Sequence, residues 1–157
     1  MEKAPDLTQM FLYDKFPIWY EYCHETQAIT LADVILSGEP YPIKALYGVG
    51  MNFKMYPQTD KLVKALDQID FFVNTDLFMT YTSKFADIVL PCCSSLERGE
   101  FKVYPGGYGV YTKPVIQPLY ESKSDTDILC ELARYMELDD PLLLEGYEAS
   151  VDYIMQG

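Results

Sequence analysis

Residues 71–91, FFVNTDLFMTYTSKFADIVLP, decide the fold because they hold two short apolar runs separated by a helical turn. Residues 71–74 predict a strand, residues 80–86 predict one or two helical turns, and residues 87–90 predict a second strand that Pro91 closes. Apolar runs without alternation are typical of strands covered on both faces. The stretch therefore predicts neighbouring strands of a parallel sheet, joined by right-handed crossovers.

Strand and helix patterns continue on the amino-terminal side of this stretch. Residues 43–49, IKALYGV, predict a first strand that ends at Gly50. Between the first two strands, apolar residues recur with the i, i+1, i+4, i+7 spacing of a surface helix: Leu62, Val63, Leu66 and Ile69. Further upstream, Thr30 followed by Asp33 has capping-box spacing and predicts a short helix that stops at Gly38.

The carboxyl-terminal half predicts a hairpin followed by helices. Residues 101–112 flank the turn-forming residues 105–107, Pro-Gly-Gly, which fits a hairpin or a long loop. Ser124 and Asp127 predict a capped helix, and an amphipathic piece is expected at 142–154. Together, these patterns predict an α/β fold: a Rossmann-like three-layer domain with a short parallel sheet and an appended hairpin or loop.

Composition predicts one packed domain. The chain has 157 residues, 49% of them hydrophobic, and 24 acidic against 12 basic residues give a net charge of −12. Because nucleic-acid phosphates are bound through Lys and Arg, this charge argues against a nucleic-acid partner. No apolar run approaches the roughly 20 residues that span a bilayer, so we expect no membrane insertion. We expect residues 1–40 to be an aromatic-rich flank that packs on a domain of residues 41–157.

The sequence holds no pattern typical of a metal site or of a nucleophile. Its four cysteines, Cys23, Cys92, Cys93 and Cys130, form no CxxC pair, and it has one histidine. A structural zinc site takes about four Cys or His ligands, and an iron–sulfur cluster takes clustered thiolates. We therefore predict no metal-binding and no catalytic residue in this chain. The segment after Met1 is polar and acidic, so no signal peptide is expected and the cellular location stays open.

Polar residues follow the predicted strands at their carboxyl ends, where ligands bind in open α/β sheets. Gly50 would let the backbone approach a ligand, and Asn52 offers a donor and an acceptor. Thr75 and Asp76 follow the second strand, and a carboxylate there can accept hydrogen bonds from a ribose diol or a guanine N–H edge. A dinucleotide fingerprint needs a third glycine where Phe53 stands. A turn glycine with a capping asparagine is the alternative.

Two charged residues on later segments are further candidates. Arg98 lies on a loop at the third strand end, where its guanidinium could clamp a phosphate or could be a solvated loop charge. Asp125 opens the helix after Ser124, where a carboxylate is favoured by the helix dipole. Capping alone would explain an aspartate at that position.

Four separated runs resemble the dimethyl sulfoxide reductase family of molybdenum or tungsten enzymes. They are IKALYGVGMNF (43–53), DFFVNTDLFMTYTSKFADIVLP (70–91), LERGEF (96–101) and SDTDILCELARYM (124–136). The resemblance covers about residues 40–138. It implies the third of the family's four domains, a Rossmann-like unit that binds the guanosine-diphosphate end of one molybdopterin guanine dinucleotide.

The resemblance also implies which residues bind that cofactor. Guanine and ribose would be oriented by Asn52, Thr75, Asp76 and Asp125. Gly50 would approach the pyrophosphate, and Arg98 would neutralise phosphate charge. Thr80 belongs to the family's TxT segment. Two features depart from the family: Phe53 replaces a usual proline, and residues 104–109 replace a more polar loop. That loop could serve substrate specificity or docking instead.

The resemblance further implies that this chain is one domain of a larger oxidoreductase of the kind used in anaerobic respiration. The metal ligand and an iron–sulfur cluster would lie in other domains of that parent, with molybdenum and tungsten both open. Its partners would be those domains and an electron-transfer subunit, and the isolated domain would be catalytically silent. Two alternatives remain: a free-standing nucleotide-binding module, and an interaction domain that docks through its aromatic segment. The parent's substrate is left open.

Overall fold

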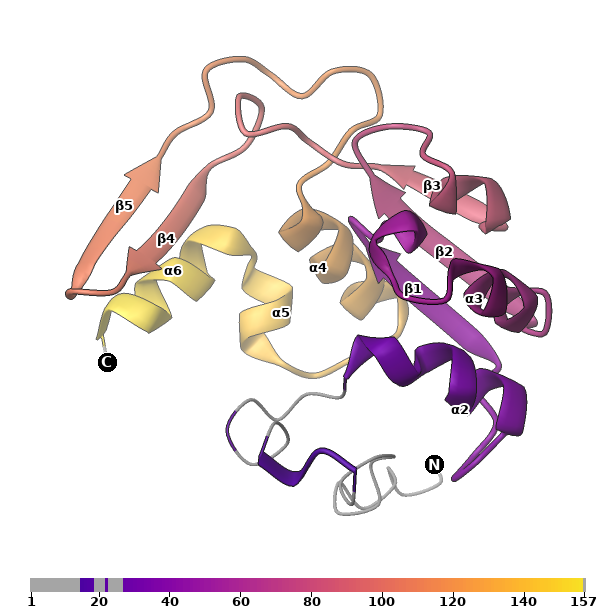
Figure 1. The fold of residues 1–157 in the computed structure, drawn as a ribbon. Coiled ribbons are helices and arrows are strands. Elements are labelled where there is room, and N and C mark those ends of the chain that lie inside the picture. The colour runs from indigo at the N-terminus through magenta and orange to yellow at the C-terminus, as the bar shows by residue number, and fades with distance from the viewer. Residues whose placement is uncertain (1–14, 19–21, 23–26, 157) are drawn as a thin grey trace. The chain divides into compact units, whose positions relative to one another are not determined.

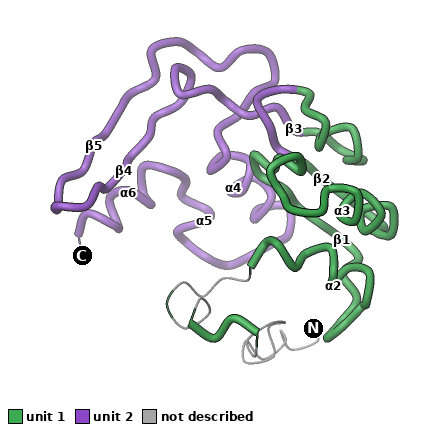
Figure 2. Tube along the Cα trace, viewed as in Figure 1, with its two compact units in different colours: residues 1–74, 79–89 green, residues 75–78, 90–157 purple. Residues whose placement is uncertain are grey.

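The computed structural model describes residues 15–18, 22 and 27–156, in two compact units. Unit 1 comprises Met1–Asn74 and Met79–Val89, and unit 2 comprises Thr75–Phe78 and Leu90–Gly157 (Figure 2). Most of the aromatic-rich stretch of residues 6–24 lies outside the described residues. The expected boundary at residue 40 stays a prediction.

Helices and strands alternate through the first half of the chain, and a hairpin and three helices follow (Figure 1). Between residues 27 and 156 the α-helices are α2 (Leu31–Ser37), α3 (Thr59–Leu66), α4 (Asp125–Tyr135), α5 (Pro141–Glu145) and α6 (Tyr147–Gln156). Short 3-10 helices span Ala28–Thr30, Phe53–Met55 and Thr82–Phe85. The strands are β1 (Ala45–Val49), β2 (Phe71–Asp76), β3 (Ile88–Pro91), β4 (Glu100–Tyr104) and β5 (Tyr108–Thr112).

Strands β1, β2 and β3 form a three-stranded parallel sheet in that order, and β4 and β5 form a separate antiparallel pair. This confirms the predicted α/β class with a short parallel sheet and an appended hairpin. The apolar runs marked the strands correctly, but the expected cover on both faces is incomplete, because Val49, Phe71 and Ile88 are exposed. None of the helices in the described part of the chain has the length and apolar character needed to cross a bilayer.

The core of unit 1 is built around Phe53. Its side chain is fully buried, and its ring centroid lies 6.0 Å from that of Phe72 on β2 and 6.2 Å from that of Phe85. Leu62 and Ala65 of α3 and Ala32 and Ile35 of α2 belong to the same core. The residue that departs from the dinucleotide fingerprint thus fills the space beside the sheet, which a glycine would leave empty.

The short helix α2 forms as predicted, but the predicted capping box at its start is wrong. Thr30 has helical backbone angles, and its hydroxyl donates to the carbonyl of Gln27 at 2.7 Å instead of capping α2. Asp33, expected to complete a capping box, forms an ion pair with Lys61 of α3. The predicted stop is confirmed: Gly38 has a φ of 69° and its N–H donates to Val34. A left-handed residue that glycine adopts freely ends many helices in this way.

Unit 2 confirms the hairpin and the capped helix. Strand β4 pairs with β5 from Glu100↔Thr112 to Tyr104↔Tyr108. Ser124 caps α4, since its Oγ accepts the N–H of Asp127 at 3.1 Å. The single amphipathic piece expected at 142–154 is wrong. It is two helices, α5 and α6, separated by Gly146, whose φ of 92° favours glycine and interrupts a helix.

Candidate functional site

Arg98 in unit 2 lies between two carboxylates. Its Nη1 donates to Asp125 Oδ2 at 2.8 Å, and its Nη2 lies 3.4 Å from Glu100 Oε1. The three side chains are only 26–29% exposed. Lys102 contacts the other oxygen of Glu100 at 3.2 Å and is itself more exposed. Two of the predicted cofactor residues, Arg98 and Asp125, are therefore joined directly.

Backbone hydrogen bonds bring Asp76 and the start of α4 to the same strand end. The N–H of Cys92, one residue after β3, donates to the carbonyl of Asp76 at 3.3 Å. Cys92 also forms a parallel bridge with Lys123, two residues before Asp125. Such convergence at the carboxyl ends of parallel strands is where ligands bind in open α/β sheets.

Cys92 follows β3 and is half-buried near several of these charges. Burial raises the pKa of the Cys92 thiol, the carboxylates of Asp125 and Asp76 raise it further, and Arg98 opposes them. Three predicted site residues thus affect the pKa of one thiol, which the sequence analysis did not assign to the site. Its position directly after the third strand was the available signal. Cys92, Cys93 and Cys130 are free thiols.

A second group of predicted residues lies in unit 1. Gly50 follows β1 with a φ of 56°, and a cavity of about 400 Å³ is lined by residues 46–52, Met55 and Tyr56. Asn52 Oδ1 accepts the N–H of Lys54 at 3.1 Å, so this oxygen caps the turn that follows, as the structural alternative expected. The Asn52 amide nitrogen is the group left for a ligand.

Thr80 belongs to a buried network of polar side chains in unit 1. Its Oγ1 lies 2.9 Å from Ser83 Oγ, which also accepts from Asn74 Nδ2 at 3.0 Å. Thr82 Oγ1 accepts the N–H of Phe53 at 2.9 Å and is fully buried. The TxT segment therefore links β2 to the loop after β1. Sequence analysis missed Asn74 and Ser83, since a buried pair nine residues apart has no local signature.

The structure thus gathers the predicted residues into two groups. Gly50, Asn52 and Thr80 lie in unit 1, and Thr75, Asp76, Arg98 and Asp125 lie in unit 2. Thr75 is fully buried in β2 and contributes to packing within the sheet.

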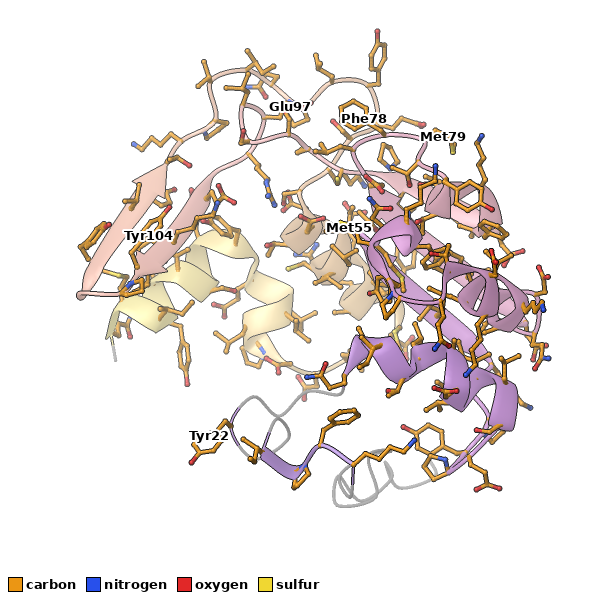
Figure 3. All side chains as sticks on the ribbon, in the orientation of Figure 1. Tyr22, Met55, Phe78, Met79, Glu97 and Tyr104 are labelled. Carbon is orange, nitrogen blue, oxygen red and sulfur yellow. The ribbon has the colours of Figure 1, made fainter. Side chains whose placement is uncertain are left out.

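Glu97 is a buried carboxylate beside Arg98 in the sequence, and the sequence analysis gave it no role. It accepts four hydrogen bonds: from the N–H and Oγ of Ser94, the N–H of Leu119 and the Oγ of Ser122. These bonds, that of the Ser94 hydroxyl first, lower the pKa of Glu97 to about 2. The S-x-x-E spacing of Ser94 and Glu97 was the signal that could have revealed it. Figure 3 shows Glu97 in the loop between β3 and β4.

Arg98, Glu100 and Asp125 form a cluster of charged side chains, the unit 2 cluster, in which two buried polar atoms make no hydrogen bond. Arg98 Nε and Asp125 Oδ1 are shielded from solvent and have no hydrogen-bond partner. A cavity of about 270 Å³ in the same unit is lined by Arg98, Glu100, Phe101 and Tyr147, among others. Buried polar atoms without partners are rare and point to a missing ligand or water. The donor and acceptor fit a polar organic ligand such as a nucleotide.

The described residues hold no group of His, Cys, Asp and Glu side chains that could bind a metal ion.

Comparisons with known proteins show the family of this chain. A family model described as molybdopterin oxidoreductase matches residues 21–135. Dopamine dehydroxylase of Eggerthella lenta is 34% identical over 127 residues, 78% of this chain and 12% of that protein. Trimethylamine-N-oxide reductase of Haemophilus influenzae is 39% identical over 100 residues, 60% of this chain and 12% of that protein. Acetylene hydratase of Pelobacter acetylenicus matches in structure with a TM-score of 0.63 and 32% identity, over 73% of this chain and 17% of that one.

Proposed function

Because this chain belongs to the molybdopterin oxidoreductase family, we propose that it binds the guanosine-diphosphate end of a molybdopterin guanine dinucleotide. The chain spans about 12% of the length of the curated relatives it matches first. The proposed function is therefore that of one domain, and the oxidoreductase activity is proposed for the larger enzyme to which it contributes.

The observation that carries the proposal is the Arg98–Asp125 pair with its two unpartnered buried atoms. A guanine edge presents N–H donors, and a ribose presents hydroxyl donors, which carboxylates accept. Asp125 and Asp76 supply such carboxylates at the carboxyl ends of the strands, the expected ligand position in this class of fold. The seven residues proposed for the cofactor are Gly50, Asn52, Thr75, Asp76, Thr80, Arg98 and Asp125.

In unit 1, the loop after β1 is proposed to bind the pyrophosphate. Gly50 has a left-handed backbone, and the position of a Cβ there is open, with nothing within 4 Å. A phosphate can approach such a backbone closely and accept from its N–H groups. Thr80 is proposed to hold the neighbouring turn through its bond to Ser83.

When bound, the molybdopterin's molybdenum or tungsten would supply oxygen-atom or electron transfer, which is the hard chemistry of such cofactors. This chain binds and orients the nucleotide end, and its described part holds no metal-ligand cluster. The metal ligand, an iron–sulfur cluster, the remaining domains and an electron-transfer subunit are proposed for the parent enzyme.

The test is the cofactor content of the full-length enzyme with Asp76→Ala. Acid hydrolysis of the dinucleotide releases GMP, so GMP and molybdenum or tungsten per protein report its occupancy. We expect Asp76→Ala to lose most of both. Asp67→Ala, which removes an exposed carboxylate just after α3, is the matched control and should keep both. Full occupancy in Asp76→Ala would contradict the proposal and favour an interaction domain.

A further inference from the structure

We infer that Arg98 is a positioning residue, which acts on the bound nucleotide by orienting Asp125 and makes no contact with phosphate. The inference rests on the proposed function and deepens it. It replaces the phosphate-neutralising role that the family resemblance implies for Arg98. The evidence is the arrangement of charges around the guanidinium.

Both terminal nitrogens of Arg98 already have carboxylate partners. Nη1 lies 2.8 Å from Asp125 Oδ2, and Nη2 lies 3.4 Å from Glu100 Oε1. One positive charge thus lies between two negative ones. A phosphate brought to this guanidinium would be repelled by Asp125 and Glu100 at nearly the distance at which Arg98 attracts it. Lys102 offsets the charge of Glu100, so the cluster has no excess positive charge that would favour an anion over a neutral ligand edge.

The same contacts fix Asp125 in one orientation. Because Oδ2 is bonded to Arg98, the unpartnered acceptor is Oδ1, which is shielded from solvent. Such an acceptor is satisfied by a ligand N–H donor, and guanine carries two on one edge, N1–H and the exocyclic amine. Without Arg98, the carboxylate could rotate and lose this alignment, since a single ordered rotamer must be held by neighbours.

Lys102 provides a matched control. It contacts the same Glu100 carboxylate at 3.2 Å, but it is 55% exposed and contacts no predicted cofactor residue. Lys102→Gln and Arg98→Gln each remove one positive charge beside Glu100. A difference between them therefore reports the bond to Asp125 and not the local charge.

The experiment is calorimetric titration of the full-length apoenzyme with GDP, IDP and pyrophosphate. IDP lacks the exocyclic amine of guanine, so the GDP-to-IDP affinity ratio reports alignment with Asp125. For wild type we expect GDP to bind on the order of tenfold more tightly than IDP, as for other sites that hydrogen-bond one polar group. Arg98→Gln and Asp125→Asn should each bring this ratio near one. The double variant should do no more than either single one.

Pyrophosphate separates the two roles of Arg98. We expect Arg98→Gln and Lys102→Gln to change pyrophosphate affinity equally and slightly. Arg98→Lys keeps the positive charge but cannot bond Asp125 and Glu100 through two separate nitrogens, so it should also lose the GDP preference. It serves as the second variant if Arg98→Gln unfolds.

A uniform loss of affinity for all three ligands in Arg98→Gln, with the GDP preference kept, would overturn the inference and make Arg98 a phosphate ligand. An unchanged GDP-to-IDP ratio in Arg98→Gln would overturn it as well. If wild type binds neither GDP nor pyrophosphate, the proposed function fails first, and the inference fails with it.

Discussion

Arg98 and Asp125 lie 27 residues apart in the sequence, yet a hydrogen bond of 2.8 Å joins them in unit 2. One comes from the loop before β4, and the other is the first residue of α4. Their contact couples the two residues that are predicted to bind the cofactor. A substitution of either residue therefore changes the surroundings of the other. The effects of the two substitutions on binding are not expected to add.

The carboxylate of Glu97 gives a prediction for acid stability. Its pKa is lowered to about 2 in the folded chain, from an ordinary value of 4.5. The folded state therefore binds the proton less readily than the unfolded state does. The stabilisation is complete above about pH 4.5 and is lost as pH falls through about 2.

We expect Glu97→Gln to be less stable than wild type at neutral pH, with the difference shrinking between pH 4.5 and 2. Urea unfolding at several pH values measures this. The control is Glu148→Gln, which removes a carboxylate from the first turn of α6 and leaves Glu97 in place. A difference that stays constant over this pH range would contradict the account.

Gly48 is required by the buried Asn74. A Cβ at position 48 would lie 2.7 Å from Asn74 Oδ1, while the same side chain donates to Ser83. We expect Gly48→Ala to cost about 1–3 kcal/mol, through overpacking and a strained buried hydrogen bond. Thermal unfolding measures it. Gly99→Ala, whose Cβ would meet its nearest atoms at an ordinary 3.4 Å, should cost less; equal costs would exclude this explanation.

The cap of α4 should be measurable in the stability of unit 2. Ser124 Oγ accepts the N–H of Asp127 at 3.1 Å. Ser124→Ala is expected to cost about 1 kcal/mol in chemical unfolding. Ser124→Asp keeps a capping acceptor and should recover most of that loss. No recovery by aspartate would show that Ser124 acts other than as a cap.

The thiol of Cys92 should report on the charges of the cluster. Burial raises its pKa, with Asp125 and Asp76 adding to the rise and Arg98 opposing it. We expect its alkylation by iodoacetamide to require higher pH than alkylation of the unfolded chain. Arg98→Gln should move the profile further up, and Asp76→Asn should move it down. Fragment ions in tandem mass spectrometry locate the label on Cys92 and not on the adjacent, buried Cys93. Unchanged pH profiles in both variants would show that these charges do not act on Cys92.

Much of the fold was predictable because its signals are local. Residues 71–91 carry both of the later sheet strands in two unbroken apolar runs, and Ser124 with Asp127 marks a helix start. The errors arose where a local signal had a competitor. Thr30 found an acceptor in the carbonyl of Gln27, and Gly146 divided one amphipathic pattern into two helices.

The candidate site was predictable only residue by residue. Strand ends and a helix start identified Asp76 and Asp125 as candidates. The link between Arg98 and Asp125 depends on the path of the chain between them, which no spacing rule encodes. Tyr104 of the hairpin (Figure 3) is exposed, and its ring stacks on that of Tyr108 with centroids 5.4 Å apart. A role of this loop in specificity or docking stays a prediction.

Hydrogen exchange of the full-length enzyme, with and without its cofactor, tests most directly whether this chain binds the nucleotide end. We predict that the cofactor slows amide exchange in residues 75–78, 92–98 and 123–127, where the unit 2 cluster lies. The tip of the hairpin, residues 104–108, should exchange equally in both forms. Unchanged exchange throughout the three cluster segments, in a sample whose other domains gain protection, would contradict the account.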